Sequence, residues 1–296
     1  MARTHTIFEG VATALITPLT EDGVNFDQYG RLIDWQIEQG VDALVIAATT
    51  GEGSTLTDEE HKACISYAVE RVAGRVPVIA GTGSNHTDYG VQLTKYAYDA
   101  GADAALIVTP YYNKATQNGL VKLFEEYASV CDIPIIVYNV PSRTGLNIEP
   151  STYEKLAAID NVTAIKEANS DIAKIVDTFA KVGDKLDIYS GNDDQITPIL
   201  AMGGKGVISV LSNVVPAETK ALCTKFFEGD VAGSAALQCK YMQLVKDLFC
   251  EVNPIPVKEA MAMMGYCDPI LRSPLCRMED ANLARLKSTM QGLGII

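Results

Sequence analysis

The sequence predicts a (β/α)8 barrel over residues 1–229, followed by a helical subdomain over residues 230–296. Short apolar runs, typical of buried parallel strands, alternate with helical patterns eight times within about 230 residues. A weak internal repeat of helix, glycine and apolar strand returns roughly every 25–35 residues, as βα units do. The tail contains helical patterns only, and no low-complexity linker separates it from the barrel.

The first half of the barrel contains four strands, each ending in a turn sequence. We predict them at residues 11–17, 43–48, 77–80 and 105–109. Each strand is followed by a predicted helix. The first helix covers residues 27–39 and stops at Gly40. The other three cover residues 57–73, a segment that ends at residue 100, and residues 118–130. The helix over 57–73 opens with a capping box from Thr57 to Glu60.

The second half repeats the same order. Its strands are predicted at residues 134–138, 162–168, 186–190 and 207–211. Its helices are predicted at 151–159, 171–182, a segment ending at 203–204, and 216–227. The tail then carries helices over about 231–250, 255–264 and 278–291, as their apolar spacing indicates.

Composition excludes several classes of function. The net charge of −13 and the isoelectric point near 4.7 argue against nucleic acid or an anionic membrane as partner. No apolar run approaches the roughly 20 residues of a membrane span, and residues 1–10 are too polar for a signal peptide. Seven scattered cysteines without a C-x-x-C pair indicate reduced thiols in a cytoplasmic protein.

The sixth predicted strand, residues 162–168, contains Lys166 in an apolar run. Burial disfavours the charged form of a lysine, so its pKa falls, and the free amine can form a Schiff base with a carbonyl. The alternative is a strand-end lysine that reaches water or pairs with a carboxylate. By strand alternation Glu167 points to the opposite face, so we do not expect it to be the counter-ion of Lys166.

Further reactive side chains follow the predicted strands, and the active sites of such barrels lie at these carboxyl ends. They are Thr49 and Thr50 after the second strand, Tyr111 and Tyr112 after the fourth, and Tyr138 and Arg143 at the fifth. Each has a structural alternative, because threonines cap turns, tyrosines pack and arginines form surface ion pairs. Their convergence on one end of one barrel favours a site.

Other chemistries fit the sequence poorly. No strand end supplies a histidine or carboxylate cluster for a metal, so we expect no metal. We interpret Asp193 and Asp194 as a solvated loop or helix start. The glycines at 81 and 83 resemble a dinucleotide turn, but His86 occupies the position of the third glycine. A phosphate-binding barrel would carry glycines after strand eight, where this chain has Ser212 and Asn213.

The motifs at the strand ends carry a resemblance to a known superfamily. They are Thr49-Thr50-Gly51-Glu52, Tyr111-Tyr112-Asn113, Tyr138-Asn139-Val140-Pro141 and Ile165-Lys166-Glu167. The chain resembles the class I pyruvate aldolases typified by N-acetylneuraminate lyase, nearly from end to end. Within them it is most similar to the dihydrodipicolinate synthase family, through the threonine pair, Arg143 and the segment Asn253-Pro254-Ile255-Pro256-Val257-Lys258.

The resemblance implies a reaction and a set of roles. Lys166 would form a Schiff base with pyruvate, and the resulting enamine would attack aspartate 4-semialdehyde to give 4-hydroxy-tetrahydrodipicolinate, the first committed step of diaminopimelate and lysine biosynthesis. No further cofactor is implied. Tyr138 would be the general acid/base, and Thr50 would link it to Tyr112 of a neighbouring subunit in a homodimer or homotetramer. The implied substrate-binding groups are Thr49, Thr50, Arg143, Gly191 and Ile208.

The resemblance also implies a pocket for lysine as an inhibitor. His61, Asn85 and Tyr111 match that pocket, but lysine-sensitive relatives carry glutamate at the position of Tyr89 and often histidine at that of Asp58. We therefore expect weak inhibition by lysine.

Two other functions stay open. A sibling aldolase, such as a sialic acid lyase or a ketodeoxy-sugar acid aldolase, would share the Schiff base but take a hydroxylated sugar, for which Arg143 is poorly suited. A catalytically silent barrel that senses a ketoacid is opposed by the joint presence of Lys166, Tyr138, Thr50 and Tyr112.

Overall fold

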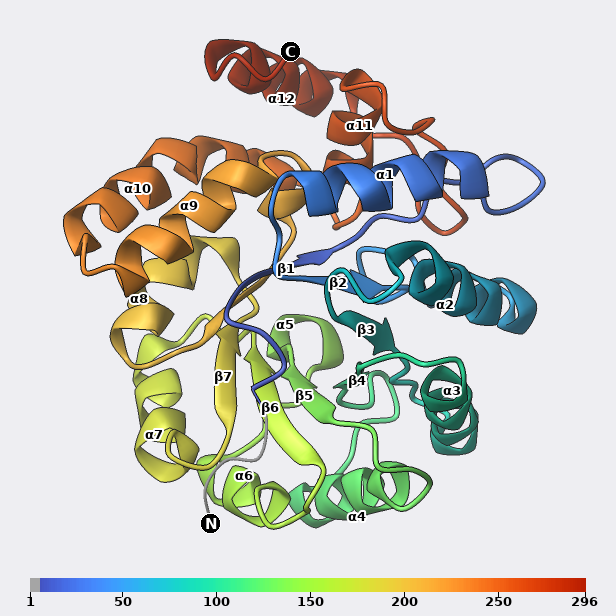
Figure 1. The fold of residues 1–296 in the computed structure, drawn as a ribbon, viewed down its shortest axis with the longest axis vertical. Helices are drawn as coiled ribbons and strands as arrows, with labels where there is room; N and C mark the ends of the chain where they lie inside the picture. Colours follow the sequence, from blue (N-terminus) through green and yellow to red (C-terminus); the bar gives the residue numbers. More distant parts are fainter. Residues whose placement is uncertain (1–5) are drawn as a thin grey trace.

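The computed structural model describes residues 6–296, and eight parallel strands form a closed barrel at its centre (Figure 1). Each strand pairs with its neighbours in sequence, and the last pairs with the first. The predicted (β/α)8 barrel is confirmed. The strands are β1 (Gly10–Ala14), β2 (Ala43–Ile46), β3 (Val78–Gly81), β4 (Ala104–Val108), β5 (Ile135–Asn139), β6 (Val162–Glu167), β7 (Asp187–Ser190) and β8 (Gly206–Ser209).

Helices alternate with the strands and surround the barrel (Figure 1). They match the predicted helices to within a few residues, and the capping box of Thr57 and Glu60 opens the second one. The helices are α1 (Phe26–Glu38), α2 (Asp58–Val72), α3 (Thr87–Asp99), α4 (Gln117–Ala128), α6 (Pro150–Leu156), α7 (Ile172–Val182), α8 (Ile196–Ala201) and α9 (Pro216–Phe227).

Two short helical turns were not predicted, α5 (Pro141–Thr144) and η2 (Leu211–Asn213), and a third, η1 (Asp193–Gln195), begins where the sequence offers a helix start as one interpretation. A segment of three or four residues is too short to show helical apolar spacing, so the sequence gives little signal for it. Two local features could have indicated α5, because Pro141 stands in its first turn and Gly145 ends it in the left-handed conformation.

The core has two layers. Inside the barrel lie mostly small and aliphatic side chains such as Ala12, Val45 and Ile79, and larger residues fill the space between the strands and the helices. Gly206 allows the barrel to close, because it has a φ of +148° and a Cβ there would lie 1.9 Å from the carbonyl oxygen of Gly10.

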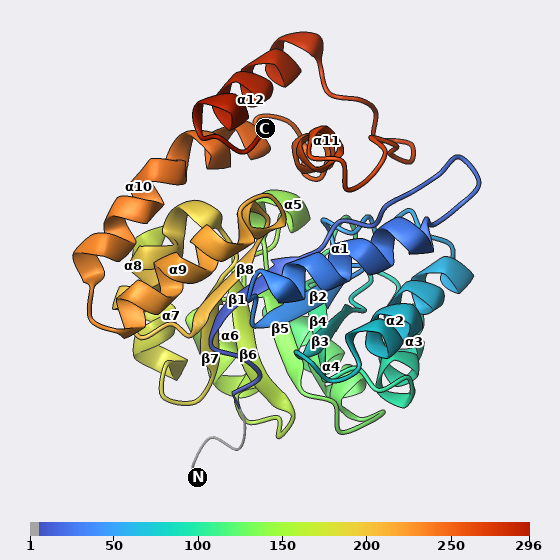
Figure 2. The ribbon, with the colours of Figure 1, turned by 45° about the horizontal axis from the view of Figure 1, so that its top comes forward.

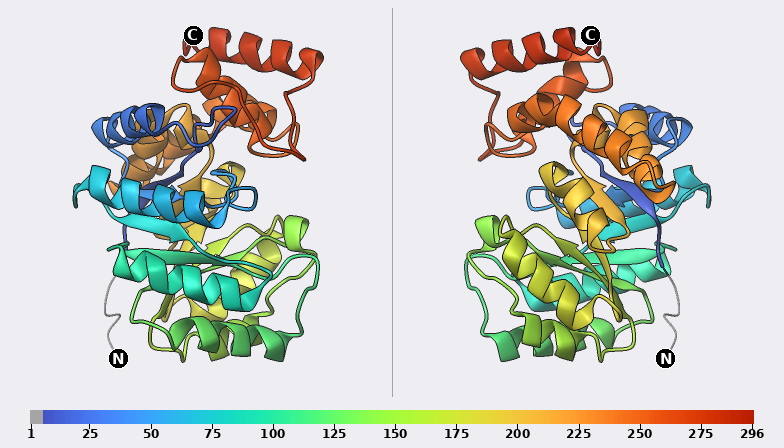
Figure 3. Two further views of the ribbon diagram at one scale, coloured as in Figure 1. Left: turned by 90° about the vertical axis from the view of Figure 1, so that its right-hand side faces the viewer. Right: turned by 90° about the vertical axis from the view of Figure 1, so that its left-hand side faces the viewer.

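The chain ends in three further helices, α10 (Val231–Leu248), α11 (Ile255–Met263) and α12 (Asp280–Gly292), where the sequence predicts them. We call residues 230–296 the C-terminal segment. It lies against one side of the barrel, near α1 (Figures 2 and 3), where Trp35 packs on Tyr266 with ring centroids 4.3 Å apart. The predicted domain boundary falls in the turn between α9 and α10, and the independence of the two parts stays a prediction.

Within residues 6–296, no helix combines the length and the apolarity that crossing a membrane requires. The same residues contain no group of three histidine, cysteine, aspartate or glutamate side chains placed to hold a metal ion. All seven cysteines are free thiols.

Candidate active site

Lys166 and Tyr138 meet inside the mouth of the barrel. They are paired across β5 and β6, and the Lys166 ammonium lies 4.2 Å from the centre of the Tyr138 ring. Lys166 is 5% exposed, and within residues 6–296 no carboxylate forms an ion pair with it. The strand lysine that the sequence singles out is therefore a buried amine without a salt bridge.

Burial lowers the pKa of Lys166 to about 7, because a charged ammonium loses its hydration there. The carboxylate of Asp193 opposes this shift, and the nearby charge of Arg143 adds to it. At neutral pH a large share of Lys166 is therefore the free amine that can attack a carbonyl.

Glu167 points away from Lys166, as strand alternation predicts. It accepts hydrogen bonds from the side-chain amide of Asn139 at 2.9 Å, the hydroxyl of Tyr153 at 3.0 Å and the backbone N–H of Asn169 at 2.9 Å. The expectation that it is not the counter-ion of Lys166 is confirmed.

The two threonines after β2 have different neighbours. Burial raises the pKa of Tyr138, and both the charge of Arg143 and a hydrogen bond with Thr49 act against this rise. The hydroxyl of Thr50 instead accepts a hydrogen bond from the side-chain amide of Asn253 at 3.0 Å. The structure thus favours Thr49 as the neighbour of Tyr138, whereas the resemblance implies Thr50.

Arg143 and Tyr112 are both exposed. Arg143 lies on α5 and donates from Nη2 to the main-chain oxygen of Asn253 at 3.0 Å. Tyr112 is 92% exposed and has a φ of +69°, which is strained for a residue with a side chain. Within this chain Tyr112 is therefore not in contact with Tyr138.

The remaining predicted substrate groups border the same region. Gly191 follows β7, and its N–H donates to the main-chain oxygen of Glu167 at 2.7 Å. A Cβ at Gly191 would lie 2.7 Å from the Cβ of Ala168. Ile208 lies on β8 in the interior cluster that also contains Tyr138.

Asp193 begins η1, which confirms the expected helix start, but its side chain is buried and the alternative of a solvated loop is wrong. Its Oδ2 accepts from the backbone N–H groups of Val210 and Leu211 at 3.0 and 2.9 Å, and its Oδ1 is buried without a hydrogen-bond partner among the described residues. Burial raises the pKa of Asp193, and the hydrogen bonds counteract this rise. Sequence reasoning gave neither Asp193 nor Asn253 these contacts, because the partners of Asp193 lie 17 and 18 positions away and that of Asn253 lies 203 positions away.

One cavity of about 490 Å³ runs from the barrel mouth toward α2 and α3. Thr49, Tyr138 and Arg143 line one part of it, and Lys166 lies off its wall, against Tyr138. Its other part is lined by residues of the predicted lysine pocket: His61, Tyr89, Tyr111 and Asp58. Asn85 is not on the wall, and its main-chain oxygen accepts from Asn113 at 2.9 Å.

The part of the cavity lined by residues of the predicted lysine pocket contains the carboxylate of Asp58, which already has a partner. Lys62 donates to Asp58 at 2.7 Å. Burial raises the pKa of the Tyr89 hydroxyl, and so do the charge of Asp58 and its hydrogen bond with Tyr89. Burial lowers the pKa of His61, whose Nε2 lies 2.8 Å from the oxygen of Gly81.

Comparison with known proteins places these features in a family context. Residues 7–293 match the model of the dihydrodipicolinate synthetase family. The 4-hydroxy-tetrahydrodipicolinate synthase of Clostridium perfringens is 52% identical over 291 residues, which are 98% of this chain and 100% of that protein.

Two solved structures are similar over nearly the whole chain. The dihydrodipicolinate synthase of Acinetobacter baumannii, solved in complex with pyruvate, has 39% identity and a TM-score of 0.95, covering 98% of this chain and 100% of that one. The DHDPS of Cyanidioschyzon merolae with lysine bound has 34% identity and a TM-score of 0.94, covering 99% and 100%.

Proposed function

This chain belongs to the dihydrodipicolinate synthetase family, and we propose that it performs the family reaction through a Schiff base on Lys166. It condenses pyruvate with L-aspartate 4-semialdehyde to give 4-hydroxy-tetrahydrodipicolinate, which makes it a lyase of the class I aldolase type in the pathway to diaminopimelate and lysine. The observation that carries the proposed chemistry is the buried, unpaired amine of Lys166 beside Tyr138.

The reaction begins at the nitrogen of Lys166. The free amine attacks the ketone carbon of pyruvate, and loss of water leaves a positively charged iminium. That charge makes a methyl proton acidic, and its loss gives an enamine. The enamine carbon attacks the aldehyde of the second substrate, whose oxygen then takes up a proton. The amino group of this substrate closes the ring on the imine carbon and releases Lys166.

Tyr138 is the general acid/base for these proton transfers, because its ring contacts the amine of Lys166. Its raised pKa keeps the phenol protonated, so it can donate to the departing water and the new alkoxide. Thr49 continues the relay, and Tyr112 of a neighbouring subunit completes it. The 92% exposure of Tyr112 supports this contact between subunits, in a homodimer or homotetramer.

The carboxylates of the two substrates bind to different groups. Thr49 and Thr50 donate to pyruvate, and Gly191 and Ile208 offer backbone groups beside it. Arg143 binds the carboxylate of aspartate 4-semialdehyde, because a guanidinium is always charged and fits a carboxylate well. This preference also favours the synthase over an aldolase that takes a neutral sugar. The free thiols support a cytoplasmic location.

Reductive trapping tests the proposal directly. Borohydride added with pyruvate should attach the three-carbon unit irreversibly to Lys166, and mass spectrometry of peptides locates it. The trapped enzyme should be inactive, and untreated enzyme should convert aspartate 4-semialdehyde but not N-acetylmannosamine. Wild-type enzyme without an adduct on Lys166 would end the Schiff-base account, and turnover of the sugar alone would favour the sibling aldolase.

We further propose that lysine inhibits this enzyme only weakly. The carboxylate in its pocket belongs to Asp58 and is already paired with Lys62 and hydrogen-bonded to Tyr89, so an incoming amine must compete for it. The double variant Asp58→His and Tyr89→Glu should become more sensitive to lysine. The control Asp88→Ala changes an exposed residue next to Tyr89 on α3 and should leave the sensitivity to lysine unchanged. Complete inhibition of the wild type by sub-millimolar lysine would contradict this proposal.

A further inference from the structure

One asparagine of the C-terminal segment contacts both groups to which we assign the two substrate carboxylates. The side-chain amide of Asn253 donates to Oγ1 of Thr50 at 3.0 Å. Its main-chain oxygen accepts from Nη2 of Arg143, also at 3.0 Å. Thr50 follows β2 and Arg143 lies on α5, so a single residue next to α11 joins two separate parts of the barrel mouth.

The direction of the first hydrogen bond determines what Thr50 can do. An amide N–H only donates, so the hydroxyl oxygen of Thr50 accepts, and its own hydrogen is free for another acceptor. A carboxylate accepts hydrogen bonds and cannot donate them. Asn253 thereby directs the hydroxyl of Thr50 to act as a donor, which is the role that a bound ketoacid requires.

Asn253 is held firmly enough to orient its neighbours. Its side chain is 6% exposed, and one turn further along, Lys258 forms a fully buried ion pair with Glu52, two residues after Thr50. Arg272 adds a second attachment of the C-terminal segment, since its backbone N–H donates to Glu52 at 3.2 Å.

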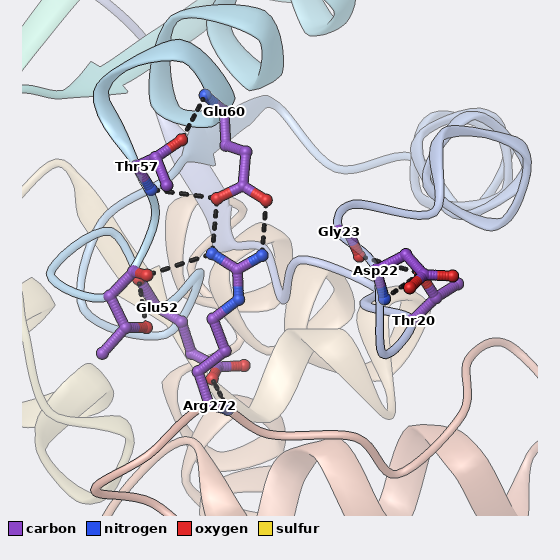
Figure 4. A network of polar contacts seen from close by, with 8 residues as sticks. Thr20, Asp22, Gly23, Glu52, Thr57, Glu60 and Arg272 are labelled. Atoms are coloured by element: carbon purple, nitrogen blue, oxygen red, sulfur yellow. Dashed lines mark hydrogen bonds and ion pairs between the residues drawn. The ribbon is translucent and has the colours of Figure 1, made fainter.

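The side chain of Arg272 extends this attachment along the loop after β2 (Figure 4). Its guanidinium donates to the oxygen of Thr55 at 3.1 Å and forms an ion pair with Glu60. Glu60 in turn closes the capping box with Thr57, at the start of α2. The loop that carries Thr50 is thus fixed to the C-terminal segment at several points.

We propose that Asn253 is a positioning residue for both substrates, orienting the hydroxyl of Thr50 toward pyruvate and holding the guanidinium of Arg143 over the barrel mouth. This inference rests on the proposed function, in which Thr50 and Arg143 bind those substrates. Its two contacts use different atoms, so they can be separated by experiment. Substitution of the side chain removes the contact with Thr50 but leaves the main-chain oxygen for Arg143.

The test measures the pyruvate concentration that gives half-maximal borohydride trapping on Lys166. In Asn253→Ala it should rise about tenfold, the size expected for weakening one hydrogen bond to a charged group. The KM for aspartate 4-semialdehyde should change little, because the partner of Arg143 remains. In a Thr50→Val background, Asn253→Ala should have no further effect on trapping, since the hydroxyl that it orients is gone.

Two further variants guard against a general structural effect. Asn282→Ala removes a comparable side-chain amide, which donates to Glu251 at 2.7 Å in the same segment, and should leave trapping unchanged. Asn253→Asp keeps the shape but replaces the donor by a negative charge, so it should raise half-saturation more than alanine does. Unchanged half-saturation in either Asn253 variant, or a full effect of Asn253→Ala in the Thr50→Val background, would overturn the inference. Loss of the adduct in the wild type would instead count against the Schiff base itself.

Discussion

Two lysines are deeply buried among residues 6–296, and they differ in what faces them. Lys258 on α11 is fully buried and pairs with the equally buried carboxylate of Glu52. Lys166 on β6 is 5% exposed and faces the ring of Tyr138, with no ion-pair partner among residues 6–296. Burial lowers the pKa of both, but at Lys258 the charge of Glu52 and its hydrogen bond work against that shift.

This difference shows that burial alone does not make a lysine reactive. A paired ammonium is stabilised in its charged form and joins two parts of the structure, here the C-terminal segment and the loop after β2. A buried lysine without an ion-pair partner is more stable in its neutral form, and the neutral amine is a nucleophile. The same substitution at the two positions should therefore damage different properties.

The largest expected effect is the loss of catalysis in Lys166→Met. Methionine has a similar length but no amine, so the rate of condensation should fall by on the order of 10⁴-fold or more. The thermal unfolding midpoint should stay the same or rise, because the variant no longer buries an unpaired amine. Steady-state assays and calorimetry check both parts, and a marked loss of stability would mean that Lys166 has a structural role like that of Lys258.

The burial of Lys166 in a barrel strand could be predicted from the sequence because the signal is local. A lysine within an apolar strand is conspicuous, and the alternation of strands and helices indicates which end of the barrel it faces. The fold was predictable for the same reason, since apolar spacing within each segment reflects which face is buried. The structure confirms eight strands and the three terminal helices with small shifts at their ends.

Lys258 and Asn253 could not be assigned a role in this way. Their partners, Glu52 and Thr50, lie 206 and 203 positions away, so only the folded chain brings them together. The choice of Thr50 over Thr49 came from the resemblance and not from a local pattern. Strand alternation could not have made this choice, because Ala47 after β2 has a φ of +53° and interrupts it.

Lys258→Met should have the opposite effect from Lys166→Met. It leaves the carboxylate of Glu52 buried without its ion-pair partner, which costs about 3–5 kcal/mol of unfolding free energy. Borohydride should still trap pyruvate on Lys166 in the protein that remains folded. Chemical denaturation measures the loss of stability.

The control for this variant is the double change Lys258→Met and Glu52→Gln. A neutral amide is easier to bury than an unpaired carboxylate, so most of the lost stability should return. If Lys258→Met were as stable as the wild type, the ion pair would not hold the C-terminal segment, and the contrast between the two lysines would disappear.

The last expected effect is a dependence of stability on pH that isolates Lys166. Its pKa is about 7 in the folded protein and 10.5 ordinarily, so between these values the unfolded chain binds one proton more than the folded one. This group therefore makes the wild type more stable as pH rises from 7 toward 10.5, by about 1.4 kcal/mol per pH unit, and contributes its full destabilisation below 7.

Lys166→Met lacks this contribution, so its stability advantage over the wild type should be largest below pH 7 and shrink as pH rises. Denaturation of both proteins across this range measures the difference, in which Lys258 and the other titrating groups cancel. A constant difference would mean that Lys166 keeps an ordinary pKa, and that its amine is no more available for pyruvate than a surface lysine.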